Sequence, residues 1–401
     1  MLTSDLTRTT YRLELWRSAA SGVLETAGNT FLLLIAVRFY QAGATAKALI
    51  AAGSSVGYLA TPLVVGAVAR LGWPSSLAAA RLFSLGAIAC AVMFALPFLP
   101  VYVAGSVVAM SMWTAAVPLL TRFHQDNYPD PQRGLLYART FMVRIVASTL
   151  FAWGAGSFLT EHLGHFRILL LGFAAAFLMG RSALLRIPSR PLGSDGRRHP
   201  LHAMRFLRDD RLFRRTLTAW MLMGFANLMM LPMRVEYLAN PHYGLAKRAV
   251  DVALLTLVIP NLTRLCMTPV WGYLFDRMNF FGLRVAINLG FAIGIISFFT
   301  SDSMPGLVLA ALVYGIAGAG GDVAWGLWVT KFAPPERVAD YMSVHTFFSG
   351  ARGVLAPYVA FQAARILTLP HLGLASLGLI ALSAALLIPE IDWLRRKRAR
   401  A

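Results

Sequence analysis

Long apolar runs alternate with short polar segments along almost the whole chain. A helix needs about 18 or more apolar residues to cross the hydrocarbon core of a bilayer, and these runs reach that length. The pattern predicts an all-α integral membrane protein with twelve transmembrane helices. The predicted spans are 14–38, 46–69, 76–98, 101–122, 139–160, 167–187, 215–238, 249–271, 283–300, 306–330, 341–365 and 371–392.

Composition and charge agree with this class. The sequence is 57% hydrophobic and only 14% charged, whereas about a quarter of the residues in a soluble domain are charged. The 37 basic residues outnumber the 18 acidic ones and are concentrated in alternate polar segments, including both ends of the chain. The positive-inside rule places those segments, and so both termini, in the cytoplasm. Topology thereby accounts for the positive charge, and no nucleic-acid partner is expected.

The longest polar segment divides the chain into two halves with six predicted spans each. We expect an N-terminal six-helix bundle at 1–187, a cytoplasmic linker at 188–214, and a C-terminal six-helix bundle with a basic tail at 215–401. Pro, Gly and Ser residues mark the start of the linker. Its second part has the alternating apolar and arginine residues of an amphipathic helix that binds membrane lipid, although a solvated linker near anionic lipid is the alternative.

The two halves repeat each other at three places. "TPLVVGAVAR" (Thr61–Arg70) matches "TPVWGYLFDR" (Thr268–Arg277), and "TFMVR" (Thr140–Arg144) matches "TFFSGAR" (Thr346–Arg352). "TRF" before "DPQRGLLY" likewise matches "TKF" before "PPERVADY". All three matches fall at an offset of about 205 residues, which indicates an internal duplication. Transporters built from such repeats commonly place their binding site at the repeat interface, near the middle of the bilayer.

The segment Gly272–Arg277, with Gly282 and Arg284 after it, resembles the G-x-L-x-D-R loop motif of the major facilitator superfamily (MFS). It lies between the eighth and ninth predicted spans, where that family has it. The resemblance implies the MFS fold of two pseudo-symmetric six-helix bundles. It also implies a gating role for Gly272, Asp276, Arg277 and Arg284, in which the Asp caps a neighbouring helix and pairs with an Arg.

This sequence departs from the family pattern in two places. The equivalent segment of the first half keeps Gly66 and Arg70 but lacks the acidic residue, so a latch there must be weaker or built differently. The fifth span contains "WGAGSF" (Trp153–Phe158) in place of the Gly-Pro pair typical of proton-driven drug antiporters, which argues against that subfamily.

Ionisable residues lie deep in several of the predicted spans. Such a residue costs roughly 2.5–3.5 kcal/mol at the centre of a membrane helix, so each requires a partner or a polar cavity. The third, sixth, ninth and twelfth spans have none in their central turns, as expected of lipid-facing helices. The deep residues are Glu25, Arg144, Arg264, Asp322, His345 and Arg352.

Two roles are proposed for these residues and their polar neighbours. Glu25 and Asp322 are candidates for proton coupling, because desolvation makes a carboxylate a carrier near neutral pH. The candidates for substrate binding are Asn29, Trp113, Arg144, Asn227, Arg264, Trp325 and Arg352. Two arginines suit a carboxylate or phosphate. The alternative is that Glu25 and Asp322 neutralise the arginines in structural pairs, and the sequence leaves both open.

No cofactor, metal or catalytic residue is predicted. The cysteines, Cys90 and Cys266, lie in apolar runs. We expect both to be free thiols that are buried in the protein. His345 has no second ligand at zinc-binding spacing and is expected to be satisfied at a helix interface. No nucleotide-binding motif occurs. The glycines of "GIAGAGG" suit helix packing, because no strand precedes them.

These observations predict a secondary active transporter that moves a small solute by alternating access and is not an enzyme. We expect a monomer in the inner membrane of a bacterium, and proton coupling is a hypothesis. The alternative is a protein of transport fold that acts as a membrane receptor or assembly factor without transport. The sequence specifies neither the solute and its charge nor the direction of transport nor the coupling ion.

Overall fold

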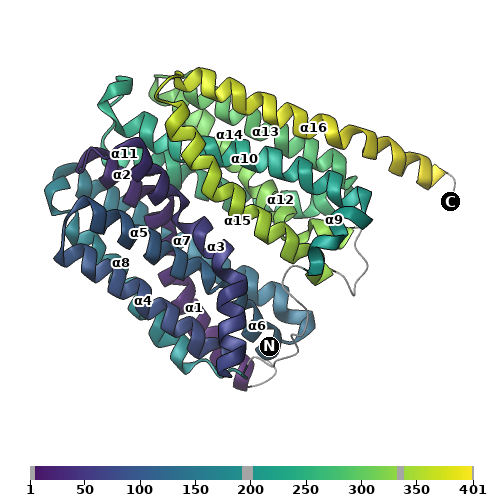
Figure 1. Cartoon of the computed structure of the whole chain (residues 1–401), viewed down its shortest axis with the longest axis horizontal. Coiled ribbons are helices and arrows are strands. Elements are labelled where there is room, and N and C mark those ends of the chain that lie inside the picture. The colour runs from purple at the N-terminus through teal and green to yellow at the C-terminus, as the bar shows by residue number, and fades with distance from the viewer. Residues whose placement is uncertain (1–4, 192–201, 332–337, 400–401) are drawn as a thin grey trace. The chain divides into compact units, whose positions relative to one another are not determined.

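The structure, a computed structural model, describes residues 5–191, 202–331 and 338–399, and these are almost entirely helical (Figure 1). Within them, eleven helices are long and apolar enough to cross a membrane. The eleventh predicted span is not among these, but it is also helical, as α15 (Val338–Ala363). Every predicted span therefore has a helical counterpart.

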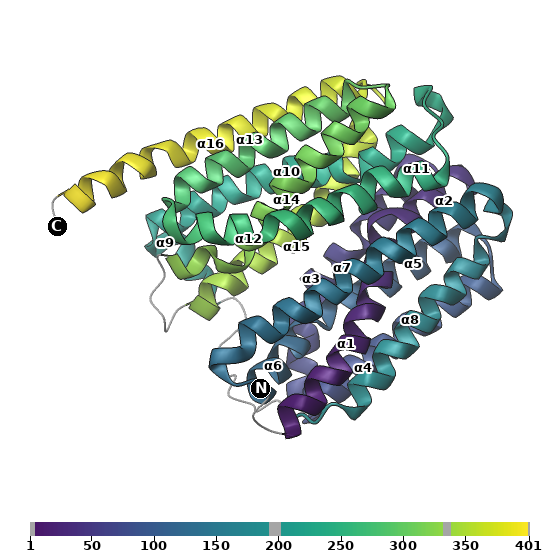
Figure 2. The same cartoon turned by 180° about the vertical axis from the view of Figure 1, so that it is seen from behind.

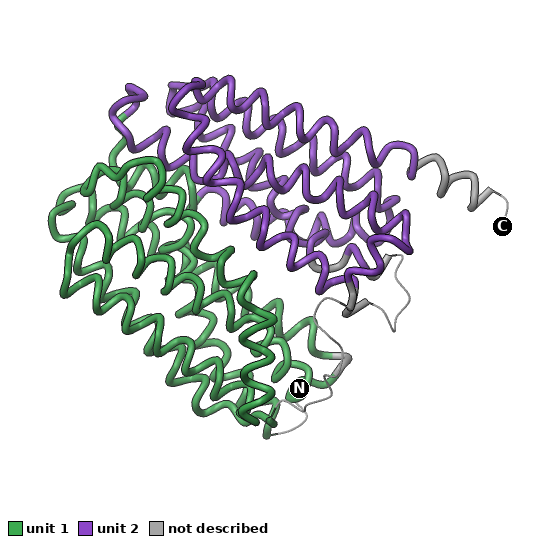
Figure 3. Tube along the Cα trace, in the orientation of Figure 1, with its two compact units in different colours: residues 1–199, 246–258 green, residues 200–245, 259–401 purple. Residues whose placement is uncertain are grey.

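The chain forms two compact units, coloured separately in Figure 3. Unit 1 comprises residues 1–199 and 246–258, and unit 2 comprises residues 200–245 and 259–401. The short segment 246–258, from the start of the eighth predicted span, thus belongs to unit 1 although it comes from the second half of the sequence. The eighth span is divided between the two units after Val258, where α12 begins at Ile259.

Unit 1 contains the first six spans. The first is one continuous rod of α1 (Asp5–Thr26), the π-helix η1 (Ala27–Phe31) and α2 (Leu32–Arg38). The others are α3 (Ala44–Leu71), α4 (Ser75–Ala95), α5 (Leu99–Ala115) with α6 (Val117–Asn127), α7 (Asp130–Glu161) and α8 (Arg167–Arg186). The segment from the second half adds α11 (Ala249–Ala253) and the π-helix η5 (Leu254–Val258).

Unit 2 contains the remaining spans. They are α10 (Arg211–Ala239), α12 (Ile259–Arg277), α13 (Phe280–Phe299), α14 (Met304–Leu327), α15 and α16 (Leu369–Ala399). Apolar residues of α10 and α13, such as Met233 and Ile287, are fully buried inside this unit. Of the two cysteines, which are both free, Cys90 in α4 is buried as expected whereas Cys266 in α12 is exposed.

The same five helix pairings occur inside each unit. Figures 1 and 2 show the helices concerned from opposite sides. In unit 1, α1 packs against α7 and α8, α4 packs against α5 and α8, and α3 packs against α5. In unit 2, α10 packs against α15 and α16, α13 packs against α14 and α16, and α12 packs against α14. Numbered by span, the second set repeats the first after a shift of six spans. This agreement supports the duplication inferred from the sequence.

The second part of the linker forms two short helices, the 3-10 helix η3 (His202–Arg205) and α9 (Phe206–Asp209). Phe206 is only 2% exposed, and its ring centre lies 4.9 Å from that of Tyr341 in α15. This apolar side chain therefore packs against the protein. Linker residues 192–201 and the side chains of the basic tail, 391–401, lie outside the described part of the structure.

Candidate functional site

In unit 1, Glu25 and Arg144 form an ion pair between α1 and α7. Arg144 donates from Nε to Oε2 of Glu25 at 2.7 Å, and the glutamate is only 8% exposed. The guanidinium carbon also lies 5.2 Å from the ring centre of Trp113 in α5. Of the two interpretations that the sequence left open, direct pairing is the one observed for these two residues.

A close helix contact supports this pair. Gly22 lies one turn before Glu25, and a Cβ atom at this position would come within 2.3 Å of the backbone oxygen of Arg144. No side chain fits there, so the backbones of α1 and α7 approach each other directly. The contact fixes the distance across which Glu25 and Arg144 meet.

Unit 2 contains a second pair, between Arg264 in α12 and Asp322 in α14. Arg264 donates from Nη2 and Nε to Oδ2 of Asp322, at 2.6 and 2.9 Å, and from Nη1 to Oδ1 of Asn261 at 3.2 Å. The aspartate side chain is 50% exposed. Because a charge against hydrocarbon is costly, we expect this open side of the pair to face a polar space.

The other substrate-binding candidates have mixed surroundings. Asn29 is exposed and lies in the π-helix η1, whereas Asn227 in α10 accepts a hydrogen bond from the hydroxyl of Tyr314 at 2.8 Å. Trp113 donates to Ser21 Oγ at 3.5 Å as well as facing Arg144. Trp325 lies beside His345, with 5.4 Å between ring centres. A role in binding solute stays a prediction for all of them.

Arg352 has different surroundings from Arg144, its counterpart in the repeat. It donates from Nη1 to the backbone oxygen of Trp220 in α10 at 2.7 Å. A Cβ atom at Gly224, one turn further along α10, would lie only 1.9 Å from Nη1, so this glycine makes room for the guanidinium group. Arg352 forms no ion pair with any residue that the structure describes.

The residues of the loop motif occupy two kinds of environment. Asp276 and Arg277 are exposed at the end of α12, where Arg277 lies over the ring of Tyr273 at 4.4 Å. No ion pair joins Asp276 to Arg277 in the described residues, and a Cβ atom at Gly272 would meet nothing within 4 Å. Arg284, in contrast, is only 1% exposed inside α13. The gating role implied by the resemblance stays a prediction.

Asn279, which the sequence did not single out, caps the helix after the motif. Its side-chain oxygen accepts hydrogen bonds from the backbone nitrogens of Phe281 and Gly282 at 2.8 and 3.4 Å. Asparagine is among the preferred residues at the start of a helix for this reason. Its position in the sequence, between the Asp-Arg pair and the next apolar run, could have indicated this capping role.

Two π-helices meet in unit 1, and sequence analysis predicted neither. Thr30 of η1 and Thr256 of η5 lie with their hydroxyl oxygens 2.9 Å apart. Nearby, Thr160 of α7 accepts from the backbone nitrogen of Val250 at 3.0 Å, and Arg38 donates to the backbone oxygen of Lys247. Single π-helical turns often mark functional positions in helices. Residue periodicity does not reveal them, because they shift the helix by one residue only.

A buried cluster at the start of α1 was also missed. Glu14 is fully buried and accepts from Arg17 at 2.5 and 2.9 Å, while His124 Nε2 lies 2.8 Å from Glu14 Oε2. The ring of Tyr128 stacks on His124, and burial raises the pKa of the Tyr128 hydroxyl, which therefore stays neutral. The spacing of three residues between Glu14 and Arg17 was a visible signal. No comparable pattern in the sequence indicated that His124 would join them.

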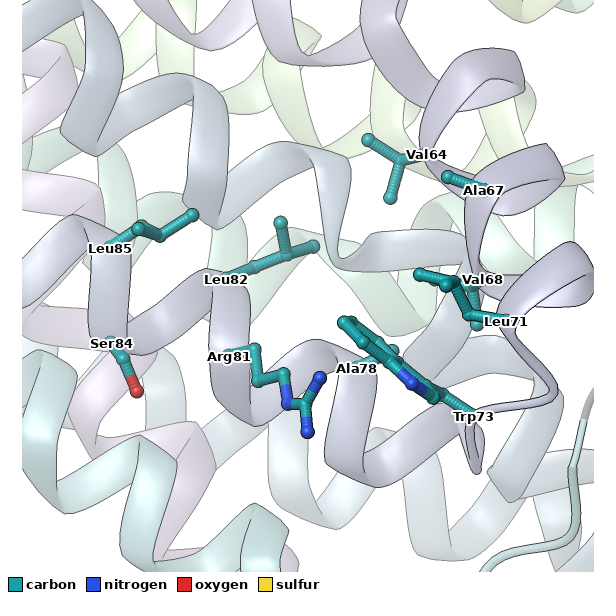
Figure 4. A pocket seen from close by; sticks show the side chains of 10 residues that line it. All are labelled: Val64, Ala67, Val68, Leu71, Trp73, Ala78, Arg81, Leu82, Ser84 and Leu85. Atoms are coloured by element: carbon teal, nitrogen blue, oxygen red, sulfur yellow. The ribbon is translucent and has the colours of Figure 1, made fainter.

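A separate cavity of about 470 Å³ lies in unit 1 between the end of α3 and the start of α4 (Figure 4). Its lining is mostly apolar and includes Val64, Leu71 and Leu85, and Arg81 lies over the ring of Trp73 at 3.6 Å. None of the candidate residues lines it, so we do not assign it to the solute. In the described residues, no group of three or more His, Cys, Asp or Glu could hold a metal ion.

Comparison with known proteins identifies the family. The sequence profile of the Major Facilitator Superfamily matches residues 18–357. No curated protein matches the sequence. The fold is similar to the crystal structure of the nucleoside transporter NupG, with a TM-score of 0.73 and 12% identity over 96% of this chain and 99% of that one.

Two further structures show the same fold. A D-xylose–proton symporter matches with a TM-score of 0.69 and 16% identity, over 95% of each chain. The human organic anion transporter MFSD10 (TETRAN) matches with a TM-score of 0.66 and 16% identity, over 96% of this chain and all of that one. The predicted fold of two six-helix bundles is thereby confirmed. Since the family profile covers most of the chain, this integral membrane protein is a member of the Major Facilitator Superfamily.

Proposed function

We propose that the protein is a secondary active transporter that moves a small solute by alternating access, and that proton movement through Glu25 or Asp322 drives it. The observation that supports this most is the pair of intramembrane ion pairs, Glu25–Arg144 and Arg264–Asp322, one in each unit. Charged groups at this depth are costly and mark ion and solute pathways in membrane proteins. Family membership supports transport in general, and the charged pairs support coupling in particular.

The coupling step follows from the chemistry of the pairs. A proton that binds Glu25 cancels its charge and removes the attraction that holds Arg144 in place. The released guanidinium group is then available to a polar group of the solute, and loss of the proton restores the pair. Asp322 and Arg264 provide the same exchange in unit 2, on a carboxylate that is half exposed. In each pair, the carboxylate therefore binds either the arginine or a proton, and the arginine binds either the carboxylate or the solute.

The setting of the protein belongs to the same proposal. The arginine-rich segments and both termini face the cytoplasm of a bacterium, and the chain works as a monomer in the inner membrane. The first solutes to test are nucleosides, sugars and organic anions, because proteins of this fold are named for transport of these classes. The similarity to those structures is below 25% identity and does not choose between them.

The test has two stages. The purified full chain is first screened by thermal shift against nucleosides, sugars and organic anions. A solute that stabilises the protein is then used, in labelled form, for uptake into proteoliposomes under a proton gradient. We expect gradient-driven accumulation in the wild type, and its loss with retained solute exchange in Glu25→Gln or Asp322→Asn. Glu161→Gln is the control, because this exposed acid lies at the end of α7.

Either of two results contradicts the proposal. If both acid variants accumulate solute like the wild type, proton coupling through these residues is wrong. If no solute of the panel stabilises or crosses the membrane with the protein, transport itself is in doubt. The receptor or assembly-factor function would then be favoured.

A further inference from the structure

Two arginines of unit 2, the buried Arg284 and the half-buried Arg352, contact the same tryptophan. The guanidinium carbon of Arg284 in α13 lies 3.7 Å from the ring centre of Trp220, and Arg352 in α15 donates to the backbone oxygen of the same residue. Arg284 is only 1% exposed. The face of an aromatic ring attracts a cation but does not accept the hydrogen bonds of a guanidinium group. Two positive charges thus flank Trp220, and the charge of Arg284 lies where water is excluded.

Several donors of these side chains have no acceptor. Nη1 and Nη2 of Arg284 and Nε of Arg352 are buried without a hydrogen-bond partner. Neither arginine forms an ion pair in the residues that the structure describes. Several described acids of the unit lie elsewhere or have other partners. Asp276 is exposed at the end of α12, Asp322 pairs with Arg264, Glu390 pairs with Arg215, and Asp210 accepts from Tyr341. The positive charge of the two arginines is therefore not neutralised by these acids.

His345 adds a third donor. It is fully buried in α15, and its Nδ1 accepts a hydrogen bond from Nε1 of Trp328 at 3.3 Å. The neutral ring therefore carries its proton on Nε2, and this atom is buried without a partner. The ring centre of His345 lies 5.3 Å from that of Trp220, so the histidine borders the same tryptophan as the two arginines.

The spacing along α15 extends this arrangement. His345, Ser349 and Arg352 are separated by four and three residues and so share one face of the helix. The hydroxyl oxygen of Ser349 is also buried without a partner. Unpartnered buried polar atoms are rare, and each calls for an explanation such as a bound ion. In this cluster, the unpartnered nitrogens of Arg284, Arg352 and His345 are all hydrogen-bond donors, and none of these side chains carries a negative charge.

We propose that Arg284, Arg352 and His345 bind a small inorganic anion inside unit 2. A halide or a similar monovalent anion accepts several hydrogen bonds and neutralises charge without requiring a donor of its own. The ligand must be small, because Arg284 and His345 are almost completely buried and Arg352 is packed directly on Gly224. The bound anion links α13 and α15 beside Trp220 of α10, and it uses neither of the two proposed coupling pairs.

Bromide provides a direct probe of this site. The purified full chain is titrated with sodium bromide in place of sodium isethionate at constant ionic strength, and thermal unfolding is followed. An anion that binds only the folded state gives a saturable rise in Tm of about 2–4 °C. We expect Arg284→Gln to weaken the apparent affinity at least tenfold, while Arg365→Gln, at an exposed arginine of the same unit, has no effect.

Two results overturn the proposal. One is a wild-type Tm that does not change with bromide, or that changes without saturation. The other is the same saturable response in Arg284→Gln as in the wild type. If Arg284→Gln does not fold, anomalous diffraction from wild-type crystals grown with bromide decides the question. A bromide peak between Arg284, Arg352 and His345 supports the site, and its absence there contradicts it.

Discussion

The hydroxyl oxygens of Thr30 and Thr256 lie 2.9 Å apart and join two π-helical turns that are 226 residues apart in the chain. Thr256 also donates to the backbone oxygen of Val252 at 2.7 Å. Thr30 is therefore the donor in the hydrogen bond between the two hydroxyls. Both side chains are buried, Thr30 completely. With the bond from Arg38 to the backbone oxygen of Lys247, this contact joins the first span to the segment 246–258 of unit 1.

The first prediction concerns this link. Thr256→Val keeps the shape of the side chain but leaves the hydroxyl of Thr30 buried without its acceptor. We expect a loss of about 1 kcal/mol in the free energy of unfolding. Thr30→Val combined with Thr256→Val should cost little more than the single change, because both partners are then removed. A double-mutant cycle in detergent measures this, and strictly additive losses would show that the two hydroxyls do not interact.

The two ion pairs should differ in what they contribute to stability. Arg144→Gln removes the guanidinium group that is bound to the Glu25 carboxylate, which is 8% exposed, and we expect a loss of about 3–5 kcal/mol in the free energy of unfolding. Arg264→Gln leaves Asp322, whose side chain is 50% exposed, and we expect a loss of about 0–1 kcal/mol. Chemical unfolding of both variants checks the order. Equal losses, or a larger loss for Arg264→Gln, would contradict the burial of the first pair.

Gly224 is predicted to be essential to the packing of Arg352. Gly224→Ala places a Cβ atom 1.9 Å from Nη1 of Arg352, and displacement of this half-buried group from the backbone oxygen of Trp220 should cost about 1–3 kcal/mol. Gly272→Ala is the matched control, since a Cβ atom there meets nothing within 4 Å. Replacing glycine by alanine inside a helix at such an open site should increase stability by about 0.5–1 kcal/mol. Thermal unfolding of the two variants should therefore give shifts of opposite sign.

The start of α13 offers a test of which residue of the loop caps the helix. Asn279→Ala removes the acceptor for the backbone nitrogens of Phe281 and Gly282, and we expect a loss of about 1 kcal/mol. Asp276→Ala, at an exposed position, should change stability by less than about 0.5 kcal/mol. Equilibrium unfolding distinguishes the two. A larger loss for Asp276→Ala would assign the capping role to the aspartate, as the resemblance implies.

The fold was predictable from the sequence to a large extent. The length of the apolar runs predicted the positions of all twelve spans, because every helix that crosses a bilayer needs about 20 mostly apolar residues. The repeats of Thr61–Arg70 and Thr268–Arg277 indicated the duplication that the shared helix pairings then showed. The π-helices η1 and η5 could not be predicted, because they depend on contacts between distant segments.

The candidate site was predictable in its residues but not in their partners. The membrane cost of a charge identified Glu25, Arg144, Arg264 and Asp322, and the structure shows how they pair. Arg284 was expected near a loop, yet it is buried against Trp220. The position of a residue along a span does not show which way its side chain points. A residue near a helix end, such as Arg284, can point toward the loop or into the protein interior.

Uptake of a solute into proteoliposomes is the decisive measurement of proton-coupled transport by this protein. A solute found by thermal shift is supplied outside vesicles that contain the wild type, Glu25→Gln or Asp322→Asn, with and without a proton gradient. We predict accumulation above the outside concentration in the wild type with the gradient, its loss in at least one of the two variants, and exchange of labelled for unlabelled solute in all three. Gradient-driven accumulation that is unchanged in both variants, or no movement of any solute by the wild type, would contradict this prediction.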